Sequence, residues 1–120
     1  MKRIALVAIA MSVAAPALAG DILGEWKRAD GRSRIRMANC GGAVCGTITW
    51  LRDANSPAHV GQQVFFGLQR TGEGWSGSAF NPEDGKTYDG KVSVSGAAMT
   101  TQGCALGGMI CKSAQWTRVN

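Results

Sequence analysis

Four cysteines are the residues of this 120-residue chain best suited to chemistry, and they occur as two close pairs. Cys40 and Cys45 have four residues between them, Cys104 and Cys111 have six, and each pair encloses two adjacent glycines. Zinc sites normally have two to four residues between paired cysteines, so only the first spacing is allowed. A redox couple normally has a Cys-x-x-Cys motif at the start of a helix, which neither pair has. We therefore expect disulfides rather than a metal or redox centre.

Other side chains that could act in catalysis are few. His59 is the only histidine, and it lacks the neighbouring ligands that a zinc site requires. Glu83 and Asp84 lie near Lys86 and Tyr88, but Asn-Pro followed by Asp-Gly is typical of a turn. The sequence has neither the Gly-x-Ser-x-Gly motif of hydrolases nor a phosphate-binding loop. We expect that the protein is not an enzyme and uses no metal or cofactor.

Asp53 and Asn55 are candidates for ligand binding. They lie on one rim of the predicted fold, where the longest predicted loop begins. Their side-chain oxygens could hydrogen-bond a ligand, or they could cap their own loop. Both interpretations stay open.

Aromatic side chains are the second group of candidate ligand-binding residues, because alternation places them on the inward face of the predicted strands. They are Trp26, Trp50, Phe66, Trp75, Tyr88 and Trp116. Together they could form the wall of a pocket for a small apolar ligand, or they could simply fill the interior. Small inward residues such as Gly46, Ala79 and Ala114 fit either interpretation, since they leave open space or room for the rings.

Residues 1–19 have the features of a secretory signal peptide. Lys2 and Arg3 precede an apolar run that is shorter than the roughly 20 residues needed to span a bilayer. Ala17-Leu18-Ala19 is a small-x-small cleavage site. Cleavage after Ala19 would leave residues 20–120 as one domain, located in the periplasm or secreted.

The charge of the mature chain does not indicate a nucleic-acid partner. Loss of the two basic residues of the signal peptide lowers the net charge from +5 to +3. Arg32, Arg34 and Arg36 share one face of a predicted strand, for which a solvated surface is the simpler interpretation. No segment after the signal peptide is apolar enough to span a membrane.

The mature chain is predicted to consist of short strands joined by turns. Turn signals such as Asp30-Gly31, Gly41-Gly42 and Ser95-Gly96 recur about every 10 to 12 residues, with alternating apolar and polar residues between them. The predicted strands cover residues 23–29, 32–39, 44–51, 62–70, 74–80, 86–94, 97–104 and 111–119. Eight hairpin-linked strands indicate an all-β fold, a single eight-stranded up-and-down antiparallel barrel.

The predicted hairpins also indicate how the cysteines pair. In each pair, both cysteines fall on outward-facing positions that flank a Gly-Gly turn. Four cysteines allow three connectivities, and the hairpins favour Cys40–Cys45 and Cys104–Cys111. Because alternate turns share one rim of such a barrel, these two disulfides would lie at opposite ends.

Several motifs resemble known families. Gly24-Glu25-Trp26 and Trp116-Thr117-Arg118 resemble the Gly-x-Trp motif and the late-strand arginine of lipocalins. Asn81-Pro82-Glu83-Asp84-Gly85-Lys86-Thr87-Tyr88, with Gly74-Trp75 and Gly103-Cys104, resembles the small secreted bacterial proteins of domain-of-unknown-function family 2147. This resemblance implies a lipocalin-like barrel in which Arg118 packs over Trp26 and closes the base. It implies no particular activity, since the family has none assigned.

Two hypotheses about function follow. The first is a lipocalin-like protein that binds a small apolar or amphipathic ligand inside the barrel. The second is a packed barrel whose surface binds an envelope protein, for example as an inhibitor of a hydrolase. An interior cavity would favour the first, and a filled interior with a protruding loop over residues 52–61 would favour the second.

Overall fold

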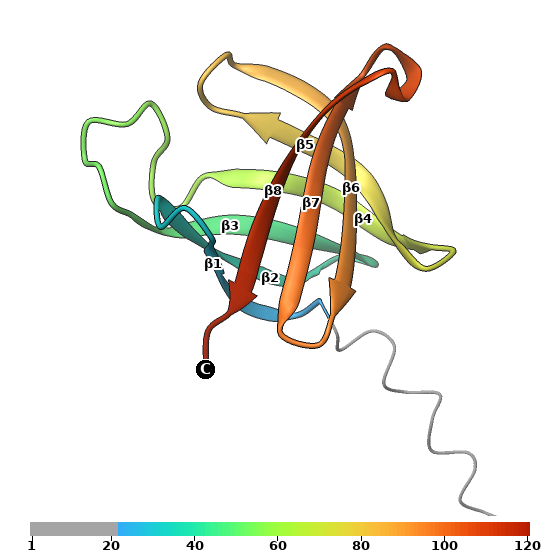
Figure 1. The fold of residues 1–120 in the computed structure, drawn as a ribbon, viewed down its shortest axis with the longest axis horizontal. Helices are drawn as coiled ribbons and strands as arrows, with labels where there is room; N and C mark the ends of the chain where they lie inside the picture. Colours follow the sequence, from blue (N-terminus) through green and yellow to red (C-terminus); the bar gives the residue numbers. More distant parts are fainter. Residues whose placement is uncertain (1–21) are drawn as a thin grey trace, which may run out of the picture.

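The computed structural model describes residues 22–120, so the predicted signal peptide lies outside the described residues. Eight strands follow one another around a closed barrel (Figure 1). Their bounds are β1 Gly24–Arg28, β2 Ser33–Cys40, β3 Ala43–Leu51, β4 Gln63–Thr71, β5 Gly74–Asn81, β6 Lys86–Ser95, β7 Ala98–Ala105 and β8 Ile110–Arg118, with a short 3-10 helix, η2, at Leu106–Gly108. Neighbouring strands are antiparallel, and β1 pairs with β8. The predicted eight-stranded up-and-down barrel is confirmed.

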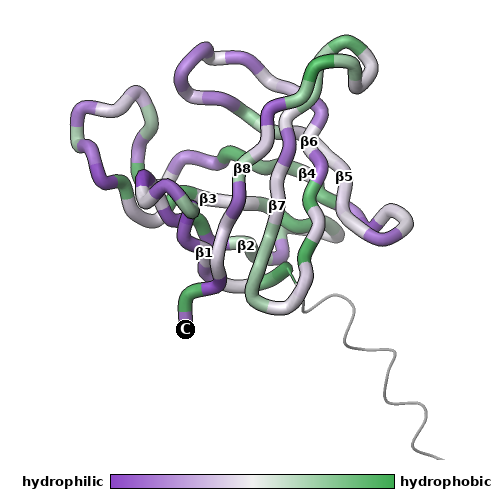
Figure 2. The backbone as a smooth tube through the Cα atoms, viewed as in Figure 1, coloured by the Kyte–Doolittle hydropathy of each residue, from purple (hydrophilic) through white to green (hydrophobic). Residues whose placement is uncertain are grey.

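Apolar and polar residues alternate along the strands, and this alternation decides which side chains enter the barrel (Figure 2). On β2, Ser33, Ile35 and Met37 are buried. Arg34 and Arg36 alternate with them, and Arg36 pairs with Glu25 on the outer surface at 3.1 Å. Arg34 and Arg36 thus alternate with the inward residues, whereas Arg32, which was predicted to share their face, lies before β2 in the β1–β2 turn and pairs with Asp30 and Glu83.

One end of the barrel, here called the base, is closed by the residues that enter β1. Ile22 and Trp26 are fully buried, and Trp26 Nε1–H donates to the Ile22 carbonyl at 3.0 Å. Gly24 has a φ of 124°, which favours glycine and turns the chain into β1. The Arg118 guanidinium lies 4.3 Å from the centre of the Trp26 ring, and Arg118 Nη1 donates to the Leu23 carbonyl at 2.9 Å. The structure thus contains the lipocalin-like closure.

The opposite end, here called the mouth, carries four connections. They are the β1–β2 turn, the β3–β4 loop over residues 52–62, the β5–β6 turn and the β7–β8 turn with η2. The β3–β4 loop projects from the barrel (Figure 1). Within residues 22–120 the structure contains no helix with the length and hydrophobicity required to cross a membrane.

The prediction that Trp50 faces the interior is wrong. Pairing between β2 and β3 shifts from Arg34 with Trp50 to Ile35 with Ile48, so Thr49 is an extra residue in β3. Such a bulge reverses the alternation beyond it. Trp50 is therefore 44% exposed on the outer surface, where the Arg34 guanidinium lies 5.8 Å from its ring centre.

The prediction for Phe66 is also wrong, for the same physical reason. Between Phe66 and Gln69, β4 has two residues where β5 has one, and Gly67 adopts a φ of 57° at this bulge. Phe66 consequently is 36% exposed. Its neighbour Phe65 is buried instead and pairs with Ala79 across the sheet.

Both predicted disulfides are present. Cys40–Cys45 joins β2 to β3 near the base, and Cys104–Cys111 joins β7 to β8 near the mouth. Cys104 and Cys111 are directly opposite each other in the β7–β8 ladder. Each disulfide therefore closes one hairpin, and the two hairpins lie at opposite ends of the barrel, as the predicted connectivity requires.

Candidate functional site

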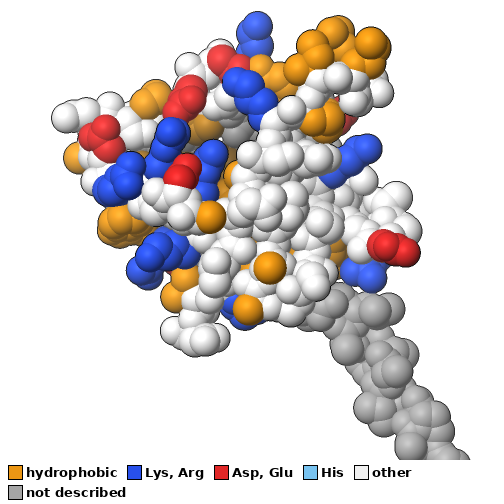
Figure 3. Space-filling view, viewed as in Figure 1, with side chains coloured by type: hydrophobic (Ala, Val, Ile, Leu, Met, Phe, Trp, Pro, Cys, Tyr) orange, Lys and Arg blue, Asp and Glu red, His pale blue; other side chains and the backbone are white. Residues whose placement is uncertain are grey.

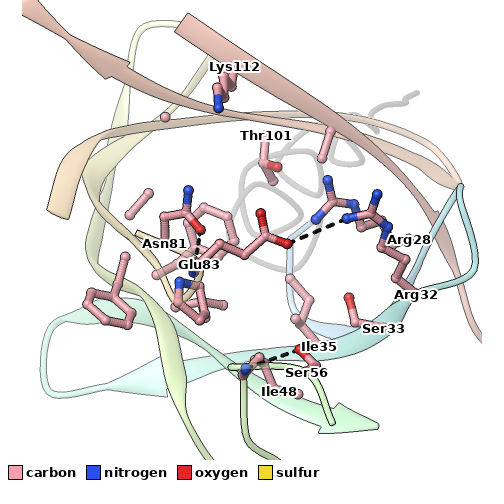
Figure 4. Close-up of a pocket in the computed structure, with 18 of the residues that line it drawn as sticks. Arg28, Arg32, Ser33, Ile35, Ile48, Ser56, Asn81, Glu83, Thr101 and Lys112 are labelled. Atoms are coloured by element: carbon pink, nitrogen blue, oxygen red, sulfur yellow. Dashed lines mark hydrogen bonds and ion pairs between the residues drawn. The ribbon is translucent and has the colours of Figure 1, made fainter. Parts of the chain in front are cut away.

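The barrel contains a cavity of about 520 Å³ that opens at the mouth (Figure 4). Apolar side chains from several strands form its wall: Ile35, Ile48, Val64, Phe65 and Trp116. Small-molecule sites in proteins typically have volumes of roughly 300–1,000 Å³ and mostly apolar walls. The interior is therefore hollow in this half of the barrel, while other inward side chains such as Trp26 and Met37 are buried in a packed part.

Small inward residues leave this space unfilled. Ala79, Gly103 and Ala114 all line the cavity. A Cβ added at Gly103 would meet only ordinary van der Waals contacts, the nearest 3.5 Å away at Tyr88 Cβ. By contrast, a Cβ added at Gly46 would lie 3.0 Å from Met37 Sδ, because that part of the interior is packed.

Trp116 is the aromatic wall of the cavity, and its polar atom is satisfied. Its side chain is buried, and its Nε1–H donates to Thr101 Oγ1 at 2.9 Å. Thr101 is one of the few buried polar residues in the described part of the chain. The Arg28 guanidinium lies 5.9 Å from the centre of the Trp116 ring, within cation–π range. The cavity wall therefore consists of the apolar Trp116 ring, with the positive charge of Arg28 at its outer edge.

Positive side chains gather on the β1–β2 side of the mouth (Figure 3). Asp30 Oδ2 lies 3.1 Å from Arg28 Nε and 3.4 Å from Arg32 Nε, so one carboxylate holds both guanidinium groups. Arg52 Nη1 reaches the same turn and donates to the Asp30 carbonyl at 3.4 Å. The result is a pair of adjacent guanidinium groups at the edge of the cavity (Figure 4).

The other sides of the mouth contribute one carboxylate and one ammonium group. Glu83 Oε2 reaches across from the β5–β6 turn to within 3.7 Å of Arg32 Nη1. Lys112 pairs with Gly103 in the β7–β8 ladder, on the inward side with Ala114. Four basic residues and two acidic residues line the cavity: Arg28, Arg32, Arg52, Lys112, Asp53 and Glu83. The lining therefore carries two more basic than acidic residues, and Asp30, which pairs with Arg28 and Arg32 from outside the lining, offsets part of this excess.

The β5–β6 turn is built by its own side chains, as its Asn-Pro and Asp-Gly pairs indicate. Asn81 Oδ1 accepts from the Glu83 backbone N–H, and Asp84 Oδ1 accepts from the Lys86 N–H, each at 2.9 Å. The Tyr88 hydroxyl donates to Asp84 Oδ2. This hydrogen bond raises the pKa of Tyr88 and lowers the pKa of Asp84. Tyr88 therefore uses its hydroxyl proton within the turn, although the residue also lines the cavity.

Three of the eight predicted ligand-binding residues line the cavity. They are Asp53, Tyr88 and Trp116. The residues that do not line it are Trp26, Trp50, Asn55, Phe66 and Trp75. Trp26 and Trp75 are buried in the packed part of the barrel, while Trp50 and Phe66 lie outside. The Asn55 backbone N–H donates to Asp53 Oδ1 at 2.9 Å, so this pair caps its own loop.

Arg28 and Lys112 are cavity residues that the sequence-based reasoning missed. Arg28 is two residues after Trp26 on β1, and Lys112 is two residues before Ala114 on β8. Strict alternation places both inward. They were overlooked because charged side chains are ordinarily expected on the outer surface.

The described residues do not assemble a metal site. Within residues 22–120, no group of three His, Cys, Asp or Glu side chains is arranged to hold an ion. His59 is exposed in the β3–β4 loop, where its backbone N–H donates to Gln62 Oε1 at 3.1 Å. The lining of the cavity contains charged, hydrogen-bonding and apolar side chains.

Known proteins share this fold and this sequence pattern. A solved structure, described as protein HP1028 from the human pathogen Helicobacter pylori and as belonging to the lipocalin family, is similar with a TM-score of 0.66 and 16% sequence identity. The likeness covers 82% of this chain and 83% of that chain, and it shows the fold alone. Comparison with curated proteins gives no match. The family model described as "Uncharacterized protein conserved in bacteria (DUF2147)" matches residues 24–118, and the chain therefore belongs to this family.

Proposed function

We propose that this protein binds a small amphipathic molecule in the cavity of the barrel and does not catalyse a reaction. The observation that carries the proposal is a cavity of about 520 Å³ with an apolar wall and a charged mouth. Burial of hydrocarbon against such a wall stabilises a complex by roughly 25 cal/mol per Å² of apolar surface. The polar mouth would fix the orientation of the ligand. The lipocalin description of the Helicobacter pylori protein supports a binding role of this kind.

The proposed site of action is the periplasm or the extracellular space. The motifs over residues 1–19 and the two disulfides support this location, because disulfides persist in oxidising compartments. A chain that stays in the cytoplasm with reduced cysteines would contradict it.

Native mass spectrometry tests both parts of the proposal. The protein would be purified from its own periplasm without refolding and measured under native and then denaturing conditions. We expect the mass of a chain cleaved after Ala19 with two disulfides, plus a stoichiometric additional mass that is lost on denaturation. Because a weak ligand can be lost in purification, a second sample of the purified protein would be incubated with added lipid, without detergent, and its native mass would be measured in parallel. Uncleaved chain, or no small molecule under either condition, would contradict the proposal.

A protein-binding role is the second candidate, and the exposed apolar β7–β8 turn favours it. Leu106, Met109 and Ile110 are 68%, 84% and 56% exposed (Figure 2). Cross-linking in intact cells would compare the wild-type protein with a Leu106→Ser, Met109→Ser double variant, and with Val60→Ser as an exposed apolar control. A partner lost only from the double variant would support this role, and an identical set of cross-links would argue against it.

A further inference from the structure

We infer that the ligand has an acidic head group, which binds at the mouth between Arg28, Arg32 and Lys112. This inference rests on the proposed function and names the chemical class of its ligand. The head group would be a carboxylate, or a sulfate or phosphate monoester. The hydrocarbon part would extend inward against Ile35 and Phe65, which line the cavity below these three cations.

The two arginines are already positioned for an anion before a ligand enters. Asp30 Oδ2 contacts the Nε atoms of both Arg28 and Arg32, at 3.1 and 3.4 Å. Asp30 Oδ1 also accepts from the backbone N–H of Arg32 at 3.0 Å, which fixes the carboxylate within the turn. A guanidinium held in this way loses less conformational entropy when it binds an anion.

Glu83 marks the position that the head group would take. Its carboxylate points across the mouth toward the arginines (Figure 4) and reaches Arg32 Nη1 at 3.7 Å. The contact is long and both side chains are more than half exposed, so the pair contributes little stability. An entering carboxylate can replace Glu83 beside Arg32 while Glu83 returns to water.

Lys112 adds a third cation to the mouth from β8, the strand that pairs with β1. It pairs with Gly103 in the β7–β8 ladder, and it is one of the residues that line the opening (Figure 4). Arg28 stands beside Trp116, where the charged edge of the mouth meets the apolar wall. In an anionic amphiphile, the head group matches the cations and the hydrocarbon matches the apolar wall. A cationic amphiphile would instead bring like charges together.

The test compares ligands that differ only in the head group. Decanoate, decanol and decyltrimethylammonium, each below its micelle concentration, would displace the neutral fluorescent probe N-phenylnaphthylamine from the wild-type protein. We expect decanoate to bind about tenfold more tightly than decyltrimethylammonium, with decanol between them. The affinity for decanoate should fall as salt is added, and the affinity for decanol should not. Decyl phosphate, measured beside decanoate, distinguishes a phosphate from a carboxylate head group.

Three substitutions locate the effect at the mouth. Lys112→Met and Arg28→Met should each lower the affinity for decanoate relative to that for decanol about fivefold to tenfold. Lys91→Met is the matched control, because Lys91 is exposed on β6 and does not line the cavity. Glu83→Gln should tighten decanoate binding about twofold to fivefold, since it removes the competing carboxylate. Thermal melting of each variant checks that the barrel remains folded.

The outcomes separate this inference from the proposed function. Equal affinities for the three head groups, or a Lys112→Met variant that behaves like Lys91→Met, would overturn the inference and leave ligand binding in place. Failure of the probe and of all the amphiphiles to bind would overturn the proposed function itself. If Arg28→Met does not fold, the exposed Lys112 and Glu83 variants still decide the matter.

Discussion

Each end of the barrel has a contact between an arginine and a tryptophan, but the two contacts have different surroundings. In the β1–β8 ladder, Trp26 pairs with Arg118 at the base, and Arg28 pairs with Trp116 toward the mouth. Arg118 lies 4.3 Å from a fully buried ring, whereas Arg28 lies 5.9 Å from its ring and is held by Asp30. The first pair closes the barrel because packed residues surround it, and the second borders a cavity because its neighbours are small.

This difference shows that an Arg–Trp contact has no fixed role. At the base, Ile22 packs below Trp26 and accepts its indole N–H, so the arginine covers a filled interior. At the mouth, the residues near Trp116 include Ala114 and Thr101, which line the cavity, so the arginine faces open space. The size of the neighbouring side chains therefore decides whether the contact stabilises the fold or is available to a ligand.

Truncation of a buried side chain at the base should have the largest effect on the free energy of unfolding. Trp26→Ala would leave a void in a packed interior, and we expect a loss of about 3–5 kcal/mol in the free energy of unfolding. Trp50→Ala is the control, since Trp50 lies on the outer surface, and it should cost less than about 1 kcal/mol. Urea denaturation monitored by circular dichroism measures both. Comparable losses in the two variants would contradict the bulge that places Trp50 outside.

Substitution of each arginine by alanine compares the two ends again, and the expected losses of stability are smaller. Arg118→Ala should lower the free energy of unfolding by about 1–3 kcal/mol, because it loses packing, the cation–π contact and the hydrogen bond to Leu23. Arg28→Ala should lower it by less than about 1 kcal/mol, since its ion pair with Asp30 is partly exposed. The same denaturation experiment applies. Equal losses would mean that the two ends are not distinct in the way described.

The smallest expected effect concerns the exposed turn at the mouth. Tyr88 is the only tyrosine, so an ultraviolet absorbance titration reports it alone. Its hydrogen bond to Asp84 raises the pKa of Tyr88 above the ordinary value of 10.0, so its midpoint should lie above pH 10 and fall toward it in Asp84→Ala. The folded chain holds this proton longer than the unfolded chain does. The stabilisation is therefore complete below pH 10 and is lost as the pH rises through the folded pKa. An unchanged midpoint would show that the hydrogen bond is absent in solution.

The barrel itself could be predicted from the sequence because short-range patterns determine it. Alternation and turn signals located the eight strands to within two residues, and the paired Gly-Gly turns indicated which cysteines meet. These features depend on neighbours in the chain, so they can be recognised without tertiary contacts.

The site was harder to predict because it depends on interruptions of those patterns. Bulges at Thr49 and near Gly67 reverse the faces of Trp50 and Phe66, and an apolar ring gives no sign of such a reversal. Arg28 and Lys112 follow the alternation, yet their charge argues for the outer surface until the cavity is seen. Whether the interior is hollow depends on how all the inward side chains pack, which no local pattern reports.

The central claim is that the cavity binds a ligand, and a probe-binding titration with a blocked cavity tests it most directly. N-phenylnaphthylamine would be titrated into the wild-type protein, into Ala114→Phe, whose ring would occupy the cavity, and into Gln115→Phe, which places a ring at an exposed position of the same strand that does not line the cavity. We predict saturable binding of one probe per chain in the wild type and in Gln115→Phe, with affinity reduced at least about tenfold in Ala114→Phe. Absence of binding to the wild type, or equal binding to all three proteins, would contradict the account.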